Sequence, residues 1–174
     1  MSILDRGAKL AEIVAATFIV IGGALAFVTF LNAEAQAKKR YTFELALSLL
    51  DDELREARFL LLREVANVID DLPEGSAGYS NVASILRAQY ASNRMLSSRE
   101  NFEISALSIL DHYGVARGCV EAELCNEAIF LDLTQAEAFQ LTCFFSSTFD
   151  SISDRLNNPS ASEGLEYFAG DEAC

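Results

Sequence analysis

The most prominent feature of the hydrophobic pattern is one uncharged stretch near the start of the chain. Residues 13–33 carry no charged side chain, and Glu12 and Glu34 close the stretch at its two ends. At about 1.5 Å per residue a helix of this length spans roughly 31 Å, which matches the ~30 Å hydrocarbon core of a bilayer. A buried helix of a soluble protein would rarely be apolar on every face for so long. The pattern therefore predicts a single transmembrane helix over residues 13–33, preceded by a short segment, residues 1–12.

A cleavable signal peptide is the main alternative for this stretch. Ala33, Ala35 and Ala37 have the A-x-A spacing of a cleavage site. However, the run is longer than the ~7–15 residues of a signal-peptide core, and its start is only weakly basic. We therefore expect an uncleaved anchor.

The residues after the anchor follow a helical period. Apolar positions recur at spacings of three and four from Phe43 to Leu72, and Pro73 ends the run. This pattern predicts one long amphipathic helix. Acidic residues at positions 51–53 lie off the apolar line and would face solvent.

Further helices are predicted from capping signals and shorter stripes. A second helix is expected over residues 80–95, and a fourth, short one over residues 121–131. Ser97 and Glu100 have the spacing of a capping box that would open a third helix, with Gly118 at its C-cap. Its predicted buried face comprises Phe102, Ala106, Ile109, Tyr113 and Ala116.

The last predicted helix opens at a second capping-box pair, Thr134 and Glu137. Its apolar stripe comprises Ala138, Leu141, Phe145, Phe149, Ile152 and Leu156. The sequence thus predicts an all-α protein: one transmembrane helix followed by a bundle-like domain of four to five helices over residues 34–159. Residues 160–174 are polar and acidic and are expected to form a C-terminal tail.

Charge is distributed unevenly along the chain. The formal net charge is -13, and residues 41–174 carry 23 acidic side chains against eight arginines and no lysine. Such a surface has no affinity for the phosphates of nucleic acid and is repelled by anionic headgroups. The bases Lys38, Lys39 and Arg40 would lie at the membrane interface. By the positive-inside rule they favour an inner-membrane protein with its C-terminal domain in the cytoplasm.

Small residues follow one face of the predicted anchor. Ala8, Ala15, Gly22 and Thr29 recur every seven residues, and Gly22 and Ala26 form a small-xxx-small pair. Small side chains allow close approach of a second helix in lipid. We expect this face to contact other transmembrane helices of a complex, or a second copy of the chain.

Candidate chemistry is sparse. His112 is the only histidine, and its sequence neighbour Asp111 points about 100° away on a helix, so we predict no catalytic role for it. The spacing of Cys119, Cys125, Cys143 and Cys174 fits no common zinc site. In the cytoplasm we expect reduced cysteines, with Cys143 in the core. On an oxidising side three pairings are possible, and Cys119–Cys125 would close a turn. No cofactor is predicted.

Two blocks of the chain resemble an uncharacterised bacterial family. They are AQAKKRYTFELALSLLDDELREARFLLL, Ala35 to Leu62, and ILDHYGVARGCVEAELCNEAIFLDL, Ile109 to Leu133. The resemblance implies an N-terminal membrane helix and a small helical cytoplasmic domain, with no assigned reaction. His112 replaces an aromatic residue of the family pattern, Gly114 stands near its usual acidic residue, and Cys119 and Cys125 are additions.

Taken together, these features predict an interaction protein. The first hypothesis is a non-enzymatic accessory or assembly subunit of a respiratory, photosynthetic or transport complex in the membrane. The second is a self-associating membrane adaptor. The third is an enzyme with an unrecognised site near His112.

Overall fold

The computed structural model describes residues 27–158, 160–170 and 174, and every regular element among these residues is a helix. It divides into two units, Met1–Arg40 and Tyr41–Cys174. The predicted all-α class is confirmed for the described residues. Residues 41–47 are helical and lead into the following elements: η1 (Ser48–Leu50), α2 (Asp52–Asp70), α3 (Tyr79–Ala91), α4 (Arg99–Glu121), α5 (Glu127–Arg155) and α6 (Glu163–Ala169).

In the first unit, residues 27–40 are helical, and Phe27 and Phe30 are exposed. Most of the predicted anchor lies outside the described residues, as do Ala8, Ala15, Gly22 and Ala26. Within the described residues, no helix combines the length and apolarity needed to cross a membrane.

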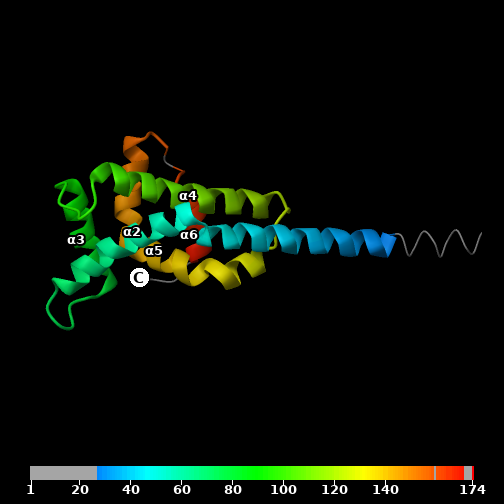
Figure 1. Cartoon of the computed structure of the whole chain (residues 1–174), viewed down its shortest axis with the longest axis horizontal. Coiled ribbons are helices and arrows are strands. Elements are labelled where there is room, and N and C mark those ends of the chain that lie inside the picture. Colours follow the sequence, from blue (N-terminus) through cyan, green and yellow to red (C-terminus); the bar gives the residue numbers. More distant parts are fainter. Residues whose placement is uncertain (1–26, 159, 171–173) are drawn as a thin grey trace, which may run out of the picture. The chain divides into compact units, whose positions relative to one another are not determined.

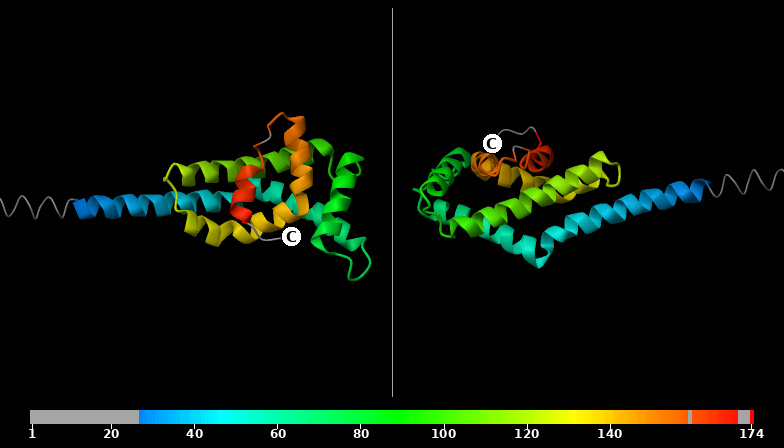
Figure 2. Two further views of the ribbon diagram at one scale, coloured as in Figure 1. Left: turned by 180° about the vertical axis from the view of Figure 1, so that it is seen from behind. Right: turned by 90° about the horizontal axis from the view of Figure 1, so that it is seen from above.

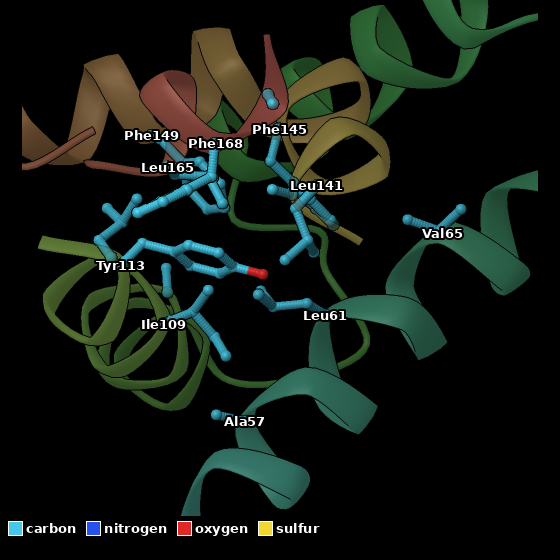
Figure 3. Close-up of a cluster of buried hydrophobic side chains, with 14 of the residues drawn as sticks. Ala57, Leu61, Val65, Ile109, Tyr113, Leu141, Phe145, Phe149, Leu165 and Phe168 are labelled. Carbon is cyan, nitrogen blue, oxygen red and sulfur yellow. The ribbon is translucent and has the colours of Figure 1, made fainter. Parts of the chain in front are cut away.

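The second unit is built around a core to which α2, α4, α5 and α6 contribute. α2 packs on α4, α3 packs on α5, and α6 contacts both α4 and α5 (Figures 1 and 2). Tyr113 of α4 points into the centre of this core, with Leu61 of α2 opposite it and Phe168 of α6 beside it (Figure 3). All three side chains are fully buried.

The predicted single helix from Phe43 to Leu72 is wrong, because the chain breaks near its middle. Ser48 donates its hydroxyl to the carbonyl of Leu45 (2.7 Å), residues 48–50 tighten into a 3-10 turn, and Asp51 is extended. α2 then begins anew at Asp52. The acidic side chains of its first turn stabilise this new N-terminus by interacting with the helix dipole.

The break also changes which residues are buried. Phe43, Leu47 and Leu50 were predicted to face the core and are exposed, whereas Ala46 and Leu49 are buried. Past the break the predicted stripe is correct, since Ala57, Leu61, Val65 and Val68 are buried in α2.

The predicted start of α4 is wrong by one residue. Ser98, not Ser97, is the N-cap, and its hydroxyl accepts a hydrogen bond from the Asn101 amide. Gly118 is not the C-cap, because the helix continues to Glu121. The five side chains predicted to be buried on this helix are all buried.

The two predicted helices after residue 121 are one helix, α5. Asn126 caps it by accepting a hydrogen bond from the Ile129 amide. Thr134 does not open a helix; it is buried within α5 and donates to the Phe130 carbonyl (2.8 Å). Glu137 instead forms an ion pair with Arg58 of α2 (3.0 Å).

The prediction of a polar tail after residue 160 is also wrong. Residues 163–169 form α6, whose Leu165, Phe168 and Ala169 are buried. A disulfide between Cys174 and Cys143 of α5 ties the end of the chain to the core. Three apolar side chains in seven residues are enough to dock this short helix, even though its composition is polar.

Candidate functional site

The second unit carries an apolar groove of about 520 Å³ on its surface. One wall is the helix over residues 41–47 with the turn that follows it. The other is the C-terminal part of α4 with the turn that joins α4 to α5. The lining residues are Tyr41, Glu44, Leu45, Ser48, Val115, Cys119, Leu124 and Cys125. The volume lies within the ~300–1,000 Å³ typical of binding pockets.

Helical periodicity brings the lining side chains of each wall onto one face of their helix. Tyr41, Leu45 and Ser48 are spaced by four and three residues and therefore share one face, as do Val115 and Cys119 on α4. The neighbouring face of the first wall is turned inward. There Thr42 is fully buried, and its hydroxyl accepts a hydrogen bond from the Asn126 amide (2.7 Å). This bond holds the first wall against the turn that forms part of the second.

A disulfide forms part of the groove. Cys119, in the last turn of α4, is bonded to Cys125, which precedes the N-cap of α5. The amides of Leu124 and Cys125 both donate to the Cys119 carbonyl (3.0 and 3.1 Å), so the turn is closed by backbone bonds as well. The expectation of reduced cysteines is wrong for this structure, whereas the alternative Cys119–Cys125 pairing is present. Cys143 is a core residue, as predicted.

The lining of the groove is solvent-accessible although it is apolar. Tyr41, Val115 and Leu124 are 62%, 62% and 60% exposed. Burying such side chains gains about 25 cal/mol per Å² of apolar surface. The groove is therefore a place where association with another apolar surface is favourable.

Acidic side chains border the groove. Glu44 lies in its lining, and exposed Asp111 lies one helical turn before Val115 on the same face of α4. Glu121 and Glu123 follow in the adjoining turn. Within residues 41–54 and 111–127 the only arginine or lysine is Arg117, which pairs with Glu121 (2.7 Å) and Glu163 (2.8 Å). Lys38, Lys39 and Arg40 directly precede the first wall in the chain, so the excess of acidic side chains lies on α4 and the turn that follows it.

His112 lies behind the groove. Its ring is buried against Tyr113 and Phe130, and burial lowers the pKa of His112 from its ordinary value to about 4. Nδ1 lies 3.5 Å from the hydroxyl oxygen of Ser48, and Nε2 has no hydrogen-bond partner. Ser48 donates its proton to the Leu45 carbonyl, so His112 is not placed to take that proton as a general base. The geometry gives a neutral, buried imidazole beside an unactivated hydroxyl.

We also searched the described residues for groups of side chains that could bind a metal ion. Across residues 27–158, 160–170 and 174, no three His, Cys, Asp or Glu side chains are grouped so that they could hold an ion. The four cysteines are used in the two disulfides.

Of the residues predicted to function in the membrane, few fall in the described part of the chain. Thr29 is exposed; Lys38 forms an ion pair with Glu34 (3.8 Å), and Lys39 and Arg40 are exposed. The groove was not predicted, although Tyr41, Leu45 and Val115 are apolar positions outside the predicted stripes and could have indicated it.

No family model, curated protein or solved structure matches this chain.

Proposed function

We propose that this protein is a single-pass membrane-anchored interaction protein, an accessory or assembly subunit of a multi-subunit membrane complex. The observation that carries the proposal is the exposed apolar groove formed by the Tyr41 and Val115 faces. It offers a docking surface on the second unit.

The anchor is supported by the sequence. An uncharged stretch over residues 13–33 is long enough to cross a bilayer, and Lys38, Lys39 and Arg40 follow it directly. Tyr41, the first residue of the groove, comes next in the chain. A partner bound there would be either another subunit of the same membrane complex, as in respiratory, photosynthetic and transport complexes, or a soluble protein that the complex recruits.

We infer that the domain works on the oxidising side of the inner membrane, contrary to the expectation from the flanking bases. Its support is the pairing of all four cysteines, since disulfides persist in the periplasm and are rare in the cytoplasm. The flanking charges oppose this orientation only slightly, because Arg6, Lys9 and the amino terminus nearly balance the three bases on the other flank. A membrane-impermeant maleimide, applied to intact cells expressing Ser160→Cys, should label that variant.

Site-specific photo-crosslinking tests the docking role. A benzophenone amino acid replaces Leu124 in the groove or, as a control, Leu133 on α5; these leucines are 60% and 52% exposed. In native membranes the probe at position 124 should give a discrete cross-linked partner that the probe at position 133 does not give. The proposal fails if position 124 yields no adduct in membranes, or if carbonate extraction releases the chain.

Self-association is the second candidate. The heptad of small residues that includes Gly22 and Thr29 would pair with itself as readily as with another protein. With Lys38→Cys, disulfide-linked dimers should form in purified protein, and Gly22→Leu with Ala26→Leu should abolish them. A monomer under these conditions contradicts self-association and leaves docking of a different protein in place.

A further inference from the structure

The groove also indicates the chemistry of the surface that binds it. We infer that its occupant is an apolar helix of a partner protein that carries lysine or arginine beside its apolar face. This inference rests on the proposed docking function and specifies the partner of that site.

The shape of the groove favours a helix. Each wall presents side chains at helical spacing: Tyr41, Leu45 and Ser48 on one side, Val115 and Cys119 on the other. Ridges of a third helix, with apolar side chains at i, i+3 or i+4 and i+7, fit between two such rows. The Cys119–Cys125 disulfide and the Thr42–Asn126 hydrogen bond fix the walls before binding, which reduces the entropy lost on association.

Charge complementarity selects a basic partner. Exposed Asp111 lies one turn before Val115 on the second row, and exposed Glu123 lies on the turn that follows α4. Arg117, the one cation within residues 111–127, is already paired with Glu121 and Glu163. A basic helix is attracted to this border, whereas an acidic helix is repelled from it.

The same border disfavours a lipid as the occupant. The apolar lining alone would accept an acyl chain, but the carboxylates would repel a phosphate or carboxylate headgroup. A neutral helix would lack the attraction that Asp111 and Glu123 provide. Among apolar occupants, a basic helix uses both the lining and its border.

Two matched synthetic peptides test the inference. Both are amphipathic helices of about 14 residues with the same leucine face; one carries lysine and the other glutamate on the flanks. The full-length protein is held in phosphatidylcholine nanodiscs, and empty nanodiscs serve as the control for binding to lipid. Binding is measured by the fluorescence anisotropy of labelled peptide. The lysine peptide should bind at least about tenfold more tightly than the glutamate peptide.

A variant pair on α4 separates the groove from the rest of the surface. Val115→Asn should weaken lysine-peptide binding about tenfold or more, while Ile104→Asn should leave it within about twofold. Both are exposed β-branched residues of one helix, at 62% and 56%, so the two changes perturb the fold alike.

The charges are tested by Asp111→Asn combined with Glu123→Gln. This double variant should remove most of the preference for lysine over glutamate and flatten the salt dependence of binding. Glu56→Gln with Glu74→Gln, two exposed acids outside the groove lining, should leave both unchanged.

Two outcomes would overturn the inference: equal binding of the two peptides, or equal loss in the Val115 and Ile104 variants. If neither peptide binds but position 124 still cross-links to a partner in membranes, the docking function stands and the assignment of a basic helix is wrong. If both experiments fail, the docking function fails with it.

Discussion

The contact between α6 and α4 at Gly164 gives the sharpest test of the fold. A Cβ atom added at Gly164 would lie 2.6 Å from the Gly114 amide nitrogen and from the Tyr113 carbonyl carbon. It would also lie 2.7 Å from the Cα atom of Gly114. These are backbone atoms of a 23-residue helix, so a side-chain rotation cannot relieve the overlap. Gly164→Ala therefore has to push α6 away from α4.

The cost follows from the packing around that contact. Overpacking of this kind costs about 1–3 kcal/mol, and the shift would partly uncover Leu165 and Phe168, each worth about 1.5–3 kcal/mol when fully buried. Alanine recovers at most ~1 kcal/mol through its helix propensity. We expect a net loss of about 2 kcal/mol, which lowers the melting temperature by roughly 5 °C in a chain of this size.

Gly114→Ala is the matched control on the facing helix. A Cβ there meets no atom within 4 Å, so only the gain in helix propensity remains. This variant should be more stable than the wild type by about 0.5–1 kcal/mol. Thermal unfolding of the full chain in mild detergent, followed by circular dichroism, measures both. Equal melting temperatures for the two variants would refute the close packing of α6 on α4.

Three further predictions concern buried polar groups and the disulfides. The Glu64 carboxylate is fully buried and accepts hydrogen bonds from the Leu96 and Ser97 amides and the Ser97 hydroxyl. Glu64→Ala should therefore lower the free energy of unfolding by about 3–5 kcal/mol, measured by urea denaturation. Cys143→Ser with Cys174→Ser should lower stability by about 3–4 kcal/mol in the same assay, because the bond closes a loop with a sequence separation of 31. Burial lowers the pKa of His112 from its ordinary value of 6.5 to about 4 in the folded chain, so the unfolded chain binds its proton first as the pH falls. Stability is therefore lost between about pH 6.5 and 4, by up to roughly 3 kcal/mol, and His112→Phe should remove that part of the pH dependence.

The sequence was informative where a helix buries a single regular face. α4 is the best case: Phe102, Ala106, Ile109, Tyr113 and Ala116 repeat at spacings of three and four, and all are buried. The core face of α5 from Ala138 to Ile152 was predicted equally well. In these helices packing and periodicity agree, so the pattern alone identifies the buried residues.

Capping signals were less reliable than periodicity. Ser97 has capping-box spacing, but its amide and hydroxyl bind Glu64, which lies 33 residues earlier, and the cap passes to Ser98. Thr134 satisfies its hydroxyl on the Phe130 carbonyl, so it continues a helix rather than starting one. In both cases the hydrogen-bond partner that decides whether the residue caps a helix lies outside the capping-box residues themselves.

The docking surface escaped prediction because its helix is apolar on more than one face. Three lines of residues run along positions 41–50, each offset from the next by about 100°. The first line is buried and comprises Thr42, Ala46 and Leu49. The second is exposed, although the pattern predicted it to be buried, and comprises Phe43, Leu47 and Leu50. The third lines the groove and comprises Tyr41, Leu45 and Ser48. Periodicity cannot choose among three lines of similar character. Tertiary contacts make that choice: Ala46 and Leu49 pack in the core, and Thr42 accepts a hydrogen bond from the Asn126 amide, 84 positions away.

Burial of the Thr42, Ala46 and Leu49 line leaves other apolar residues of this helix on the surface, where a partner could cover them. A domain of this size needs only one apolar line from each surface helix to complete its core, and the line through Ala46 already supplies it. The line through Tyr41 and Leu45 then adds further apolar surface: Leu45 is only partly buried, and Tyr41 is exposed. Such surface lowers the free energy only when a second apolar face removes it from water. Because exposed Asp111 and Glu123 stand beside it, association with another acidic domain is opposed, and the basic helix that we propose would match both the lining and its border.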